Sequence, residues 1–397
     1  MIGISKLYCG AVEASDALRY RGHAAKDMPS HLLQFAEDKK PVVVWNCTRT
    51  CNLKCVHCYA GSDAQRYDEL TTDEAKTMID DLAAFGCPVL LFSGGEPTIR
   101  PDLVELMGYA KQKGMRVVIS TNGTLITPEK AEEYAKVGLS YVGVSIDGVP
   151  ETHDKFRGVP GSFERSMEGI RNSRNAGIKV GLRMTINKRN WRELPEVFEI
   201  MKKEKINRAC FYHLVYTGRG SEIMNEDLNH EETRQAVRLI MDLTKQWFDE
   251  GGKPEILTVD NHADGVFVYH ELLKEDPERA ADVYQLLMMN KGNSTGNGIG
   301  CVSWDGEVYA DQFWRHFSFG NVKDRPFSEI WSDKSRTDER SELMFRLKDK
   351  RPFVKGRCAT CKWLDICNGN FRVRAEAATG DLWAPDPACY LTDEEIS

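Results

Sequence analysis

Short apolar runs alternate with amphipathic segments from residue 41 to about residue 215, and this alternation is the main structural signal of the chain. The apolar runs are rich in Val, Ile, Leu and aromatic residues, which predicts strands at 41–46, 89–93, 116–121, 141–146, 179–186 and 208–215. Helical periodicity predicts helices at 72–85, 101–113, 128–137, 162–176 and 194–204, and a further helix at about 231–249. Such repeated βα units imply a parallel sheet with right-handed crossovers, closed into a barrel or an open half-barrel.

The rest of the chain predicts an extension before the barrel and a smaller domain after it. Residues 251–300 lack a clear pattern and contain the glycine-rich stretch 292–298, so we expect an irregular bridging region there. A hairpin should follow, with strands 299–304 and 307–310 joined at Asp305-Gly306. The predicted organisation is α/β: an N-terminal extension or strap (1–40), a partial (β/α)6 barrel (41–250), and a bridging region with a cysteine-rich C-terminal domain (251–397).

Composition narrows the class of protein. The 397 residues are 41% hydrophobic and 28% charged, as in an ordinary globular protein. A net charge of −7 argues against a nucleic-acid-binding surface. The sequence has no apolar stretch of transmembrane length, and its N-terminus does not resemble a signal peptide, so we expect a cytoplasmic protein with no membrane partner.

The 12 cysteines add chemistry, because cytosolic cysteines in clusters are more often metal ligands than disulfides. Cys51, Cys55 and Cys58 form a C-x3-C-x2-C pattern on the loop after the first predicted strand. That is the end of a barrel where active sites lie. Iron–sulfur clusters normally take four thiolates, so a set of three suggests a four-iron cluster with one iron left open for catalysis.

A second cysteine set lies near the C-terminus as Cys358-x2-Cys361-x5-Cys367-x21-Cys389. Four thiolates can close a zinc site or saturate a [4Fe–4S] cluster, and for an isolated domain zinc is the default interpretation. The scattered cysteines are interpreted as small buried apolar residues: Cys9, Cys47, Cys87, Cys210 and Cys301.

Polar or glycine-rich residues follow the second, third and fourth predicted strands, and a basic residue lies shortly downstream. The set comprises Gly94, Gly95, Glu96, Asn122, Ser145, Asp147 and Arg157. Because carboxyl ends of parallel strands share one barrel face, these residues are expected to build a site opposite the cysteines. Glu96 can accept hydrogen bonds from an ammonium group, and Arg157 can pair with a carboxylate.

The cysteine loop after the first strand, together with Gly-Gly-Glu-Pro after the second, resembles the radical S-adenosylmethionine (SAM) superfamily. The resemblance implies that Cys51, Cys55 and Cys58 hold a [4Fe–4S] cluster whose open iron binds SAM. One electron from that cluster cleaves SAM to methionine and a 5′-deoxyadenosyl radical, which abstracts hydrogen from the substrate. The implied cofactor contacts are Gly94, Gly95 and Glu96 at the SAM amino group, Ser145 and Arg157 at ribose and carboxylate, Asn122 and Asp147 beside them, and His57 and Leu214 near the adenine.

The C-terminal cysteines resemble the SPASM/twitch extension of this superfamily, which changes the default from zinc to iron–sulfur. The resemblance implies that Cys358, Cys361, Cys367 and Cys389 hold one auxiliary [4Fe–4S] cluster that serves as an electron conduit. Phe371 and Asp311 occupy positions where two-cluster SPASM proteins carry further cysteines. We therefore expect two [4Fe–4S] clusters in total, with Cys301 as a remnant or structural residue.

Residues 4–10, 16–20, 41–46 and 311–316 further resemble radical SAM enzymes of the alternative, siroheme-dependent heme pathway. The implied reaction removes the two acetate side chains of 12,18-didecarboxysiroheme and gives Fe-coproporphyrin III. It implies an iron-tetrapyrrole substrate and a low-potential electron donor of the ferredoxin or flavodoxin type. The candidate catalytic residues are Tyr20, Asp311, Arg315 and His316. Further candidates for the substrate cavity are Arg19, Arg21, Arg219, Arg372, Arg374, Phe313 and Trp314, with His213 or His316 as a ligand of the substrate iron.

Three alternatives stay open from the sequence. The first is related tetrapyrrole chemistry, either propionate removal in heme d1 formation or decarboxylation of Fe-coproporphyrin III. The second is a SPASM peptide maturase, for which residues 1–40 are short as a peptide-binding domain. The third is an iron–sulfur electron carrier or a zinc-stabilised binding module, which would leave the polar strand ends on the SAM side without a role.

Overall fold

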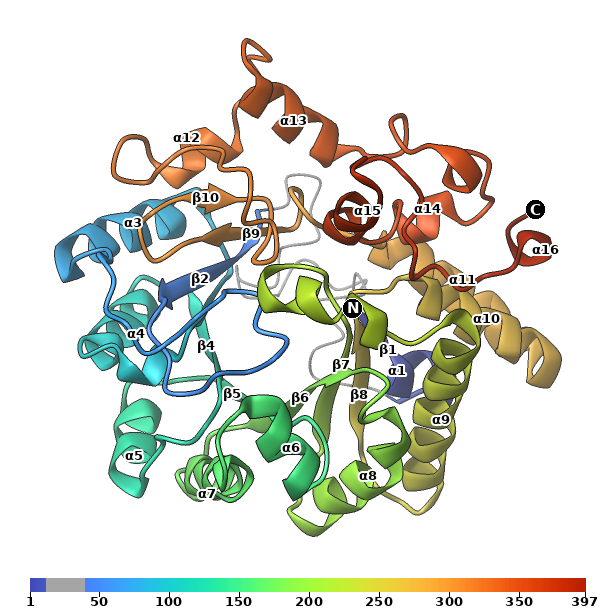
Figure 1. Ribbon diagram of the computed structural model, residues 1–397, viewed down its shortest axis with the longest axis horizontal. Coiled ribbons are helices and arrows are strands. Elements are labelled where there is room, and N and C mark those ends of the chain that lie inside the picture. Colours follow the sequence, from blue (N-terminus) through green and yellow to red (C-terminus); the bar gives the residue numbers. More distant parts are fainter. Residues whose placement is uncertain (12–39) are drawn as a thin grey trace.

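A curved parallel sheet forms the centre of the computed structural model, which describes residues 1–11 and 40–397 (Figure 1). Its central strands confirm the six predicted ones: β2 (Val42–Thr48), β3 (Val89–Gly94), β4 (Arg116–Thr121), β5 (Tyr141–Ser145), β6 (Val180–Ile186) and β7 (Arg208–His213). Each strand pairs in parallel with the next. The carboxyl ends of all six therefore meet at one end of the barrel, and the predicted α/β class is confirmed.

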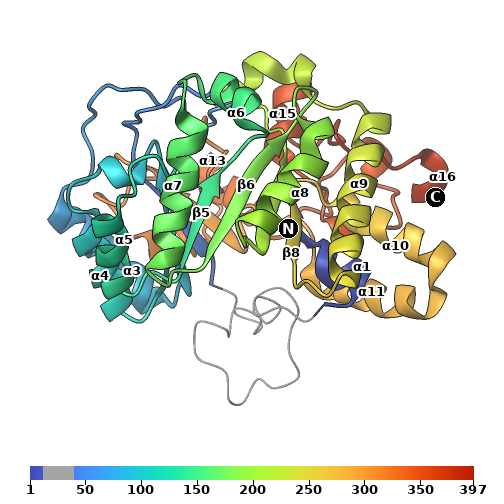
Figure 2. The same ribbon diagram turned by 90° about the horizontal axis from the view of Figure 1, so that it is seen from below.

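Helices cover the outer face of this sheet, and Figure 2 shows two of them, α7 and α8, against the outside of β5 and β6. The helices of this layer are α3 (Thr72–Phe85), α4 (Leu103–Gln112), α5 (Pro128–Lys136), α6 (Pro150–Arg157), α7 (Ser162–Asn175), α8 (Leu194–Lys203) and α9 (His230–Asp249). The patterns do not predict α6, because Phe156 is its one large apolar residue.

Local signals explain where these helices begin and end. Thr71 caps α3 through a reciprocal capping box with Glu74, and Gly86 ends the helix in the left-handed region at φ 89°. Asn229 and Glu232 form the same box at the start of α9. The boundaries follow from side-chain chemistry as well as from hydrophobic periodicity.

The prediction of an irregular region at 251–300 is wrong. This segment forms β8 (Glu255–Val259), α10 (Ala263–Glu275) and α11 (Pro277–Asn290). The strand is short and directly follows the turn residues Gly251, Gly252 and Pro254. These residues favour a loop, so the sequence pattern does not predict the strand. It pairs in parallel with β7, so the sheet continues past residue 250, and the proposed domain division there stays a prediction.

The N-terminal residues join the same sheet. The short strand β1 (Ile2–Gly3) pairs antiparallel with β8, and α1 (Ile4–Cys9) packs against α9. Ser5 Oγ accepts a hydrogen bond of 2.9 Å from the backbone N–H of Ile256. The described part of the predicted strap is therefore integrated into the barrel edge.

The predicted hairpin is confirmed as β9 (Ile299–Val302) and β10 (Val308–Tyr309), which pair antiparallel. Because β9 also pairs in parallel with β2, the sheet runs in the order β1-β8-β7-β6-β5-β4-β3-β2-β9-β10. Five short helices follow: α12 (Phe327–Trp331), α13 (Glu339–Lys348), α14 (Leu364–Cys367), α15 (Arg372–Thr379) and α16 (Asp393–Ile396). Figure 1 shows them gathered along one side of the barrel, where α14 contacts α10 and α11.

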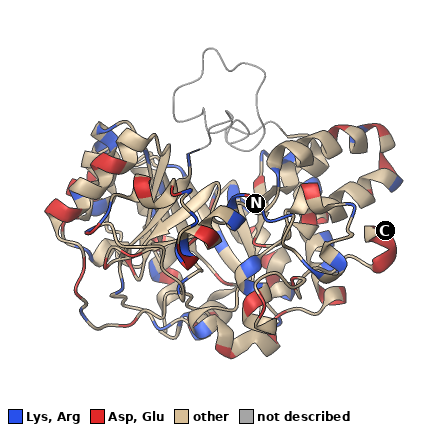
Figure 3. Cartoon of the chain, turned by 90° about the horizontal axis from the view of Figure 1, so that it is seen from above, with Lys and Arg blue, Asp and Glu red and all other residues tan. Residues whose placement is uncertain are grey.

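Charged residues of both signs are intermingled along the outer helices in Figure 3. Within residues 1–11 and 40–397, none of the helices has both the length and the apolar character needed to cross a membrane.

Candidate active site

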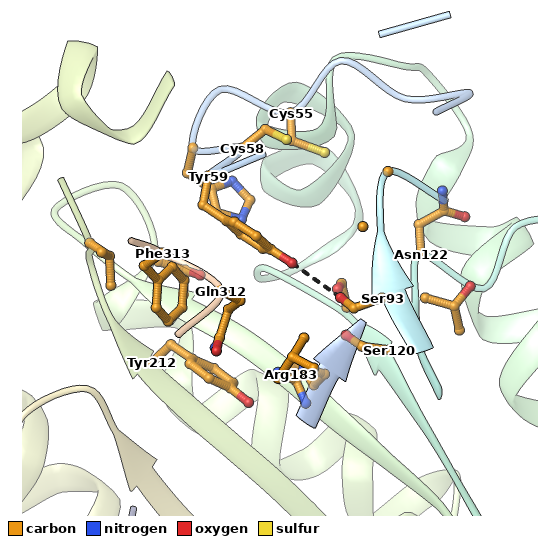
Figure 4. Close-up of a pocket in the computed structure, with 18 of the residues that line it drawn as sticks. Cys55, Cys58, Tyr59, Ser93, Ser120, Asn122, Arg183, Tyr212, Gln312 and Phe313 are labelled. Carbon is orange, nitrogen blue, oxygen red and sulfur yellow. Dashed lines mark hydrogen bonds between the residues drawn. The ribbon is translucent and has the colours of Figure 1, made fainter. Parts of the chain in front are cut away.

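The three cysteines of the C-x3-C-x2-C loop line one pocket at the carboxyl end of the barrel, and Figure 4 shows Cys55 and Cys58 beside it. Cys51 and Cys55 are buried, and Cys58 is partly exposed. The loop is held by backbone hydrogen bonds, from Lys54 N–H to the Arg157 carbonyl (3.1 Å) and from Val56 N–H to the Phe156 carbonyl (3.0 Å). Helix α6 therefore supports the cysteine loop. The pocket beside this loop has a volume of about 150 Å³.

Arg157 lies between a cysteine and a buried carboxylate. Its Nη1 is 3.5 Å from Cys55 Sγ, and its Nη2 forms an ion pair with Asp147. Burial opposes the charges, but the pairing holds the pKa of Arg157 above and that of Asp147 below their usual values. Asp147 is fully buried, accepts a 2.9 Å hydrogen bond from Thr185 N–H and does not line the pocket. The expected direct cofactor contact of Asp147 is therefore replaced by a role beneath Arg157.

Gly94 and Gly95 line the same pocket and also pack against the cysteine loop. A Cβ atom on Gly95 would lie 2.2 Å from the Thr50 carbonyl oxygen, and one on Gly94 would lie 2.3 Å from that of Thr48. Gly95 N–H donates to the Thr48 carbonyl at 2.7 Å. Only glycine permits the backbone of β3 to come this close to the cysteine loop, so the end of β3 packs directly against that loop.

Glu96 is placed differently from expectation. Its side chain is fully buried and does not line the pocket. The carboxylate accepts hydrogen bonds from Thr98 N–H and Oγ1 (3.1 and 2.7 Å), Thr121 Oγ1 (2.6 Å) and Asn122 N–H (2.7 Å). Glu96 thus joins the ends of β3 and β4, and the interpretation as a direct ligand of the SAM amino group does not match this geometry.

Replacing Glu96 with glutamine should destabilise the protein by about 1–3 kcal/mol, because an amide NH2 would face groups that already donate to the carboxylate. The check is urea unfolding of the reconstituted protein under nitrogen. Glu105→Gln is the matched control, since Glu105 is an exposed partner of Lys76. Equal stability of the two variants would contradict the bridging role.

The remaining expected cofactor residues all line the pocket. They are His57, Asn122, Ser145 and Leu214. His57 stacks on Phe156 with ring centroids 4.4 Å apart, and burial lowers its pKa to about 4, which keeps the imidazole neutral. A neutral, stacked ring beside Leu214 offers a flat apolar wall of the kind that accepts an aromatic base.

The sequence did not single out Tyr59, which follows the last cysteine. Its ring contacts Phe313 edge to face at 5.1 Å, and its hydroxyl lies 3.0 Å from Asn46 Oδ1 and 3.1 Å from Ser93 Oγ. Tyr59 thereby links the cysteine loop to β2, β3 and the loop after β10. Its only sequence signal was its place directly after Cys58.

The four C-terminal cysteines also line one cavity, together with Trp363, Leu364 and Leu391. Burial raises the pKa of all four thiols, that of Cys367 to about 12 and that of Cys389 to about 11. Within the described ranges, no group of three or more His, Cys, Asp or Glu side chains is arranged to hold a single metal ion.

Several predicted substrate residues do not reach the pocket. Arg315 stacks on Trp304, with its guanidinium carbon 4.3 Å from the ring centroid, and lines neither the cysteine pocket nor the barrel lumen. His316 is exposed and pairs with Glu376 at 2.8 Å. Asp311 accepts hydrogen bonds from backbone N–H groups of its own loop and from Thr295, which makes it a loop-capping residue. Neither Arg315 nor His316 lines the cysteine pocket or the lumen, so a direct catalytic role does not match their positions in this structure.

Other arginine candidates brace the backbone. Arg219 donates to the carbonyls of Cys55 (2.7 Å) and Ser62 (3.0 Å). Arg372 donates to carbonyls of its own domain, and Arg374 forms a buried bidentate pair with Asp386. These contacts contradict the interpretation of the three arginines as carboxylate receptors. The candidates Arg19, Tyr20 and Arg21 lie outside the described residues.

A larger cavity of about 460 Å³ adjoins the cysteine pocket inside the barrel. The two share a wall made of Val44, Leu91, Arg183, Tyr212, Asp260, Gln312 and Phe313. Arg183, Tyr212 and Asp260 were missed by the sequence interpretation. Asp260 directly follows the unpredicted strand β8, has φ 67°, and its Oδ2 has no hydrogen-bond partner.

Comparisons with known proteins agree with this geometry. The family models for the radical SAM superfamily and for the SPASM iron–sulfur cluster-binding domain match residues 45–201 and 295–362. The chain is 64% identical over 400 residues to Fe-coproporphyrin III synthase from Methanosarcina barkeri, covering 100% of this chain and 99% of that protein. It is 40% identical over 359 residues to pre-heme d1 synthase from Dinoroseobacter shibae, covering 90% and 87%. SuiB of Streptococcus suis, solved with its precursor peptide SuiA, shares the fold at TM-score 0.70 and 18% identity, covering 88% and 76%.

The chain belongs to the radical SAM superfamily, and its C-terminal part carries a SPASM iron–sulfur domain. Within the superfamily it groups with the enzymes of heme formation that include Fe-coproporphyrin III synthase. It is therefore an enzyme that uses SAM and [4Fe–4S] clusters. The pocket fits these groups, since three thiols, a glycine pair and an aromatic wall face the same space.

Proposed function

We propose that the protein is a 12,18-didecarboxysiroheme deacetylase, which removes two acetate side chains and releases Fe-coproporphyrin III. The observation that carries the proposal is the 64% identity to Fe-coproporphyrin III synthase along the whole chain, against 40% to pre-heme d1 synthase. The cavity supports it, because a lumen lined by apolar strand residues and several cations adjoins the cysteine pocket, as a polycarboxylate macrocycle requires.

In this proposal Cys51, Cys55 and Cys58 ligate the cluster that binds SAM. The contacts to SAM come from Gly94, Gly95, Asn122, Ser145, Arg157, His57 and Leu214, all of which line the pocket. When bound, the cluster and SAM supply a 5′-deoxyadenosyl radical that abstracts hydrogen from the substrate. Arg157 holds positive charge beside Cys55, where it would stabilise the thiolate and could pair with the carboxylate of SAM.

The protein contributes orientation and exclusion of water. His57 and Leu214 would provide an apolar wall for the adenine, and Tyr59 packs edge to face on Phe313, which lines both the pocket and the lumen. The pocket is lined by buried and half-buried side chains, which limits access of solvent to a radical. Glu96 acts indirectly, by fixing the ends of β3 and β4 under the cofactor.

The second half of the proposal concerns electron supply. Cys358, Cys361, Cys367 and Cys389 ligate one auxiliary [4Fe–4S] cluster that passes electrons, and Cys301 is not a ligand. Cys301 is buried within β9, where it accepts a hydrogen bond from Asn46 Nδ2 at 3.5 Å. The external donor is a low-potential ferredoxin or flavodoxin. The C-terminal domain, taken as residues 251–397, would receive the electrons in the cytoplasm.

Anaerobic incubation with 12,18-didecarboxysiroheme, SAM and dithionite is expected to yield Fe-coproporphyrin III and 5′-deoxyadenosine. Mass spectrometry of the tetrapyrrole distinguishes the candidate reactions, because acetate loss, propionate removal and decarboxylation to vinyl groups change the mass differently. Fe-coproporphyrin III offered as substrate is the control and should remain unchanged. Unchanged 12,18-didecarboxysiroheme together with vinyl formation from Fe-coproporphyrin III would overturn the assignment.

A further inference from the structure

Within the part of the chain that the structure describes, some of the positively charged side chains that line the barrel lumen pair with a carboxylate, and Arg183 does not. Lys179 and Arg208 lie at the floor of the lumen and both pair with Glu255. Arg183 lies higher, on β6, at the register position of Ser145 on β5. Among the residues that the structure describes, no carboxylate pairs with Arg183 and no acceptor receives a hydrogen bond from its guanidinium. The lumen therefore contains a guanidinium whose hydrogen-bonding capacity is unused beside the cysteine pocket.

The side chain of Arg183 is nevertheless held in place. Its guanidinium carbon lies 4.7 Å from the centroid of the Tyr212 ring, a cation–π contact across to β7. On the other side, β5 carries Gly143, where a Cβ atom would lie only 2.9 Å from Arg183 Cδ. The glycine on one neighbouring strand leaves room for the Arg183 side chain, and the tyrosine on the other strand packs against its guanidinium. Figure 4 shows Arg183 beside the cavity with Tyr212 and Gln312.

Unused polar atoms converge on the same place. Gln312 Oε1 and Asp260 Oδ2 are buried without a hydrogen-bond partner, and both residues belong to the wall shared by the two cavities. Burial raises the pKa of Asp260 to about 7, which weakens its competition for the positive charge of Arg183 near neutral pH. Arg183 is the single cation of the shared wall as described, and it lies where a group reaching from the lumen toward SAM must pass.

We propose that Arg183 binds the carboxylate of an acetate side chain of the iron-tetrapyrrole substrate and so presents that side chain to the SAM pocket. This proposal rests on the proposed function. A planar guanidinium matches a carboxylate with two hydrogen bonds, and the buried setting strengthens both. The apolar strand residues Val44 and Leu91 on the same wall suit the macrocycle. Arg183 is thus a specificity and positioning residue, chosen for side chains that end in a carboxylate.

The test compares two tetrapyrroles that differ in the acetate groups. Absorbance titrations of the anaerobic holoenzyme should give the Kd of 12,18-didecarboxysiroheme, which has both acetates, and of Fe-coproporphyrin III, which has neither. Arg183→Gln should weaken binding of the first by about 10- to 100-fold and of the second by less than about threefold. Arg183→Lys keeps the charge but loses the two-point contact, so an intermediate loss is expected.

Two controls distinguish a loss of the carboxylate contact from a general loss of affinity or of cluster content. Arg192→Gln removes an exposed arginine that stacks on Trp191 outside both cavities, and its affinities should equal those of the wild type. Iron content and cluster absorbance show whether Arg183→Gln carries its clusters; if that variant loses a cluster, Arg183→Lys decides. Equal affinity losses for both tetrapyrroles, or none, overturn the role of Arg183. If wild-type enzyme removes no acetate, the proposed function fails instead, whatever the variants bind.

Discussion

Cys55→Ala is expected to abolish SAM cleavage and to remove about half of the iron, if each of the two cysteine sets holds a four-iron cluster. Cys55 is buried, lines the pocket and has Arg157 at 3.5 Å from its sulfur. With two remaining thiolates in its set, the cluster loses a ligand that no neighbouring described cysteine replaces, since Cys47 is packed in β2 away from the pocket. The measurement is 5′-deoxyadenosine formation with dithionite, alongside iron and sulfide analysis.

Two matched alanine variants separate the clusters from each other and from general packing. Cys361→Ala should also lose about half of the iron but keep substrate-free SAM cleavage, because Cys361 lines the C-terminal cavity. Cys47→Ala should keep all iron and full cleavage. Full cleavage by Cys55→Ala, or loss of cleavage in Cys47→Ala with an intact fold, would contradict the assignment of the triad.

The six-strand barrel could be predicted because its strands are continuous apolar runs separated by capped helices. Each predicted strand reappears within a few residues of its expected bounds. The missed elements have weaker local signals. β8 is five residues long and begins with Glu255, and α10 contains Gly265, whose missing Cβ leaves room for Leu287. These two elements are stabilised by packing against residues that are distant in the sequence. A local pattern of apolar residues does not reveal such contacts.

The site shows the same division between local and long-range information. Cysteine spacing placed the triad correctly on a pocket, because that pattern is contained in one loop. The polar residues were harder: Glu96 and Asp147 carry the expected motif positions but point into hydrogen-bond networks beneath the pocket. Arg183 went unnoticed because a lone arginine within β6 resembles an exposed strand residue. Only the folded barrel shows that the Arg183 side chain points into the lumen beside the cysteine pocket.

Arginine candidates illustrate why composition alone misleads. Arg372 and Arg374 looked like receptors for a polycarboxylate substrate, yet Arg372 donates to backbone carbonyls of its own domain and Arg374 pairs with the buried Asp386. A guanidinium with several acceptors in reach is a structural brace, whereas one seated without an acceptor is available to a ligand. By this criterion Arg374 is a structural residue, whereas Arg183 is available to a ligand.

Arg374→Met is expected to destabilise the protein by about 3–5 kcal/mol, because it leaves a buried carboxylate without its partner. Arg374 and Asp386 are both fully buried and share two contacts of 2.8 Å, from Nε to Oδ1 and from Nη2 to Oδ2. The same guanidinium donates to the carbonyls of Leu214 (3.1 Å) and Asp260 (2.7 Å). It therefore fixes the C-terminal domain to the ends of β7 and β8, beside the pocket.

Urea unfolding of reconstituted protein under nitrogen, followed by far-ultraviolet circular dichroism, measures this loss. The control is Arg351→Met, which breaks an exposed pair with Asp349 and should cost less than about 1 kcal/mol. Because Leu214 and Asp260 border the pocket, folded Arg374→Met should also bind SAM more weakly than wild type, whereas Arg351→Met should not. Similar stability of the two variants would show that Asp386 finds another partner, and would contradict a role of Arg374 in joining the C-terminal domain to the barrel.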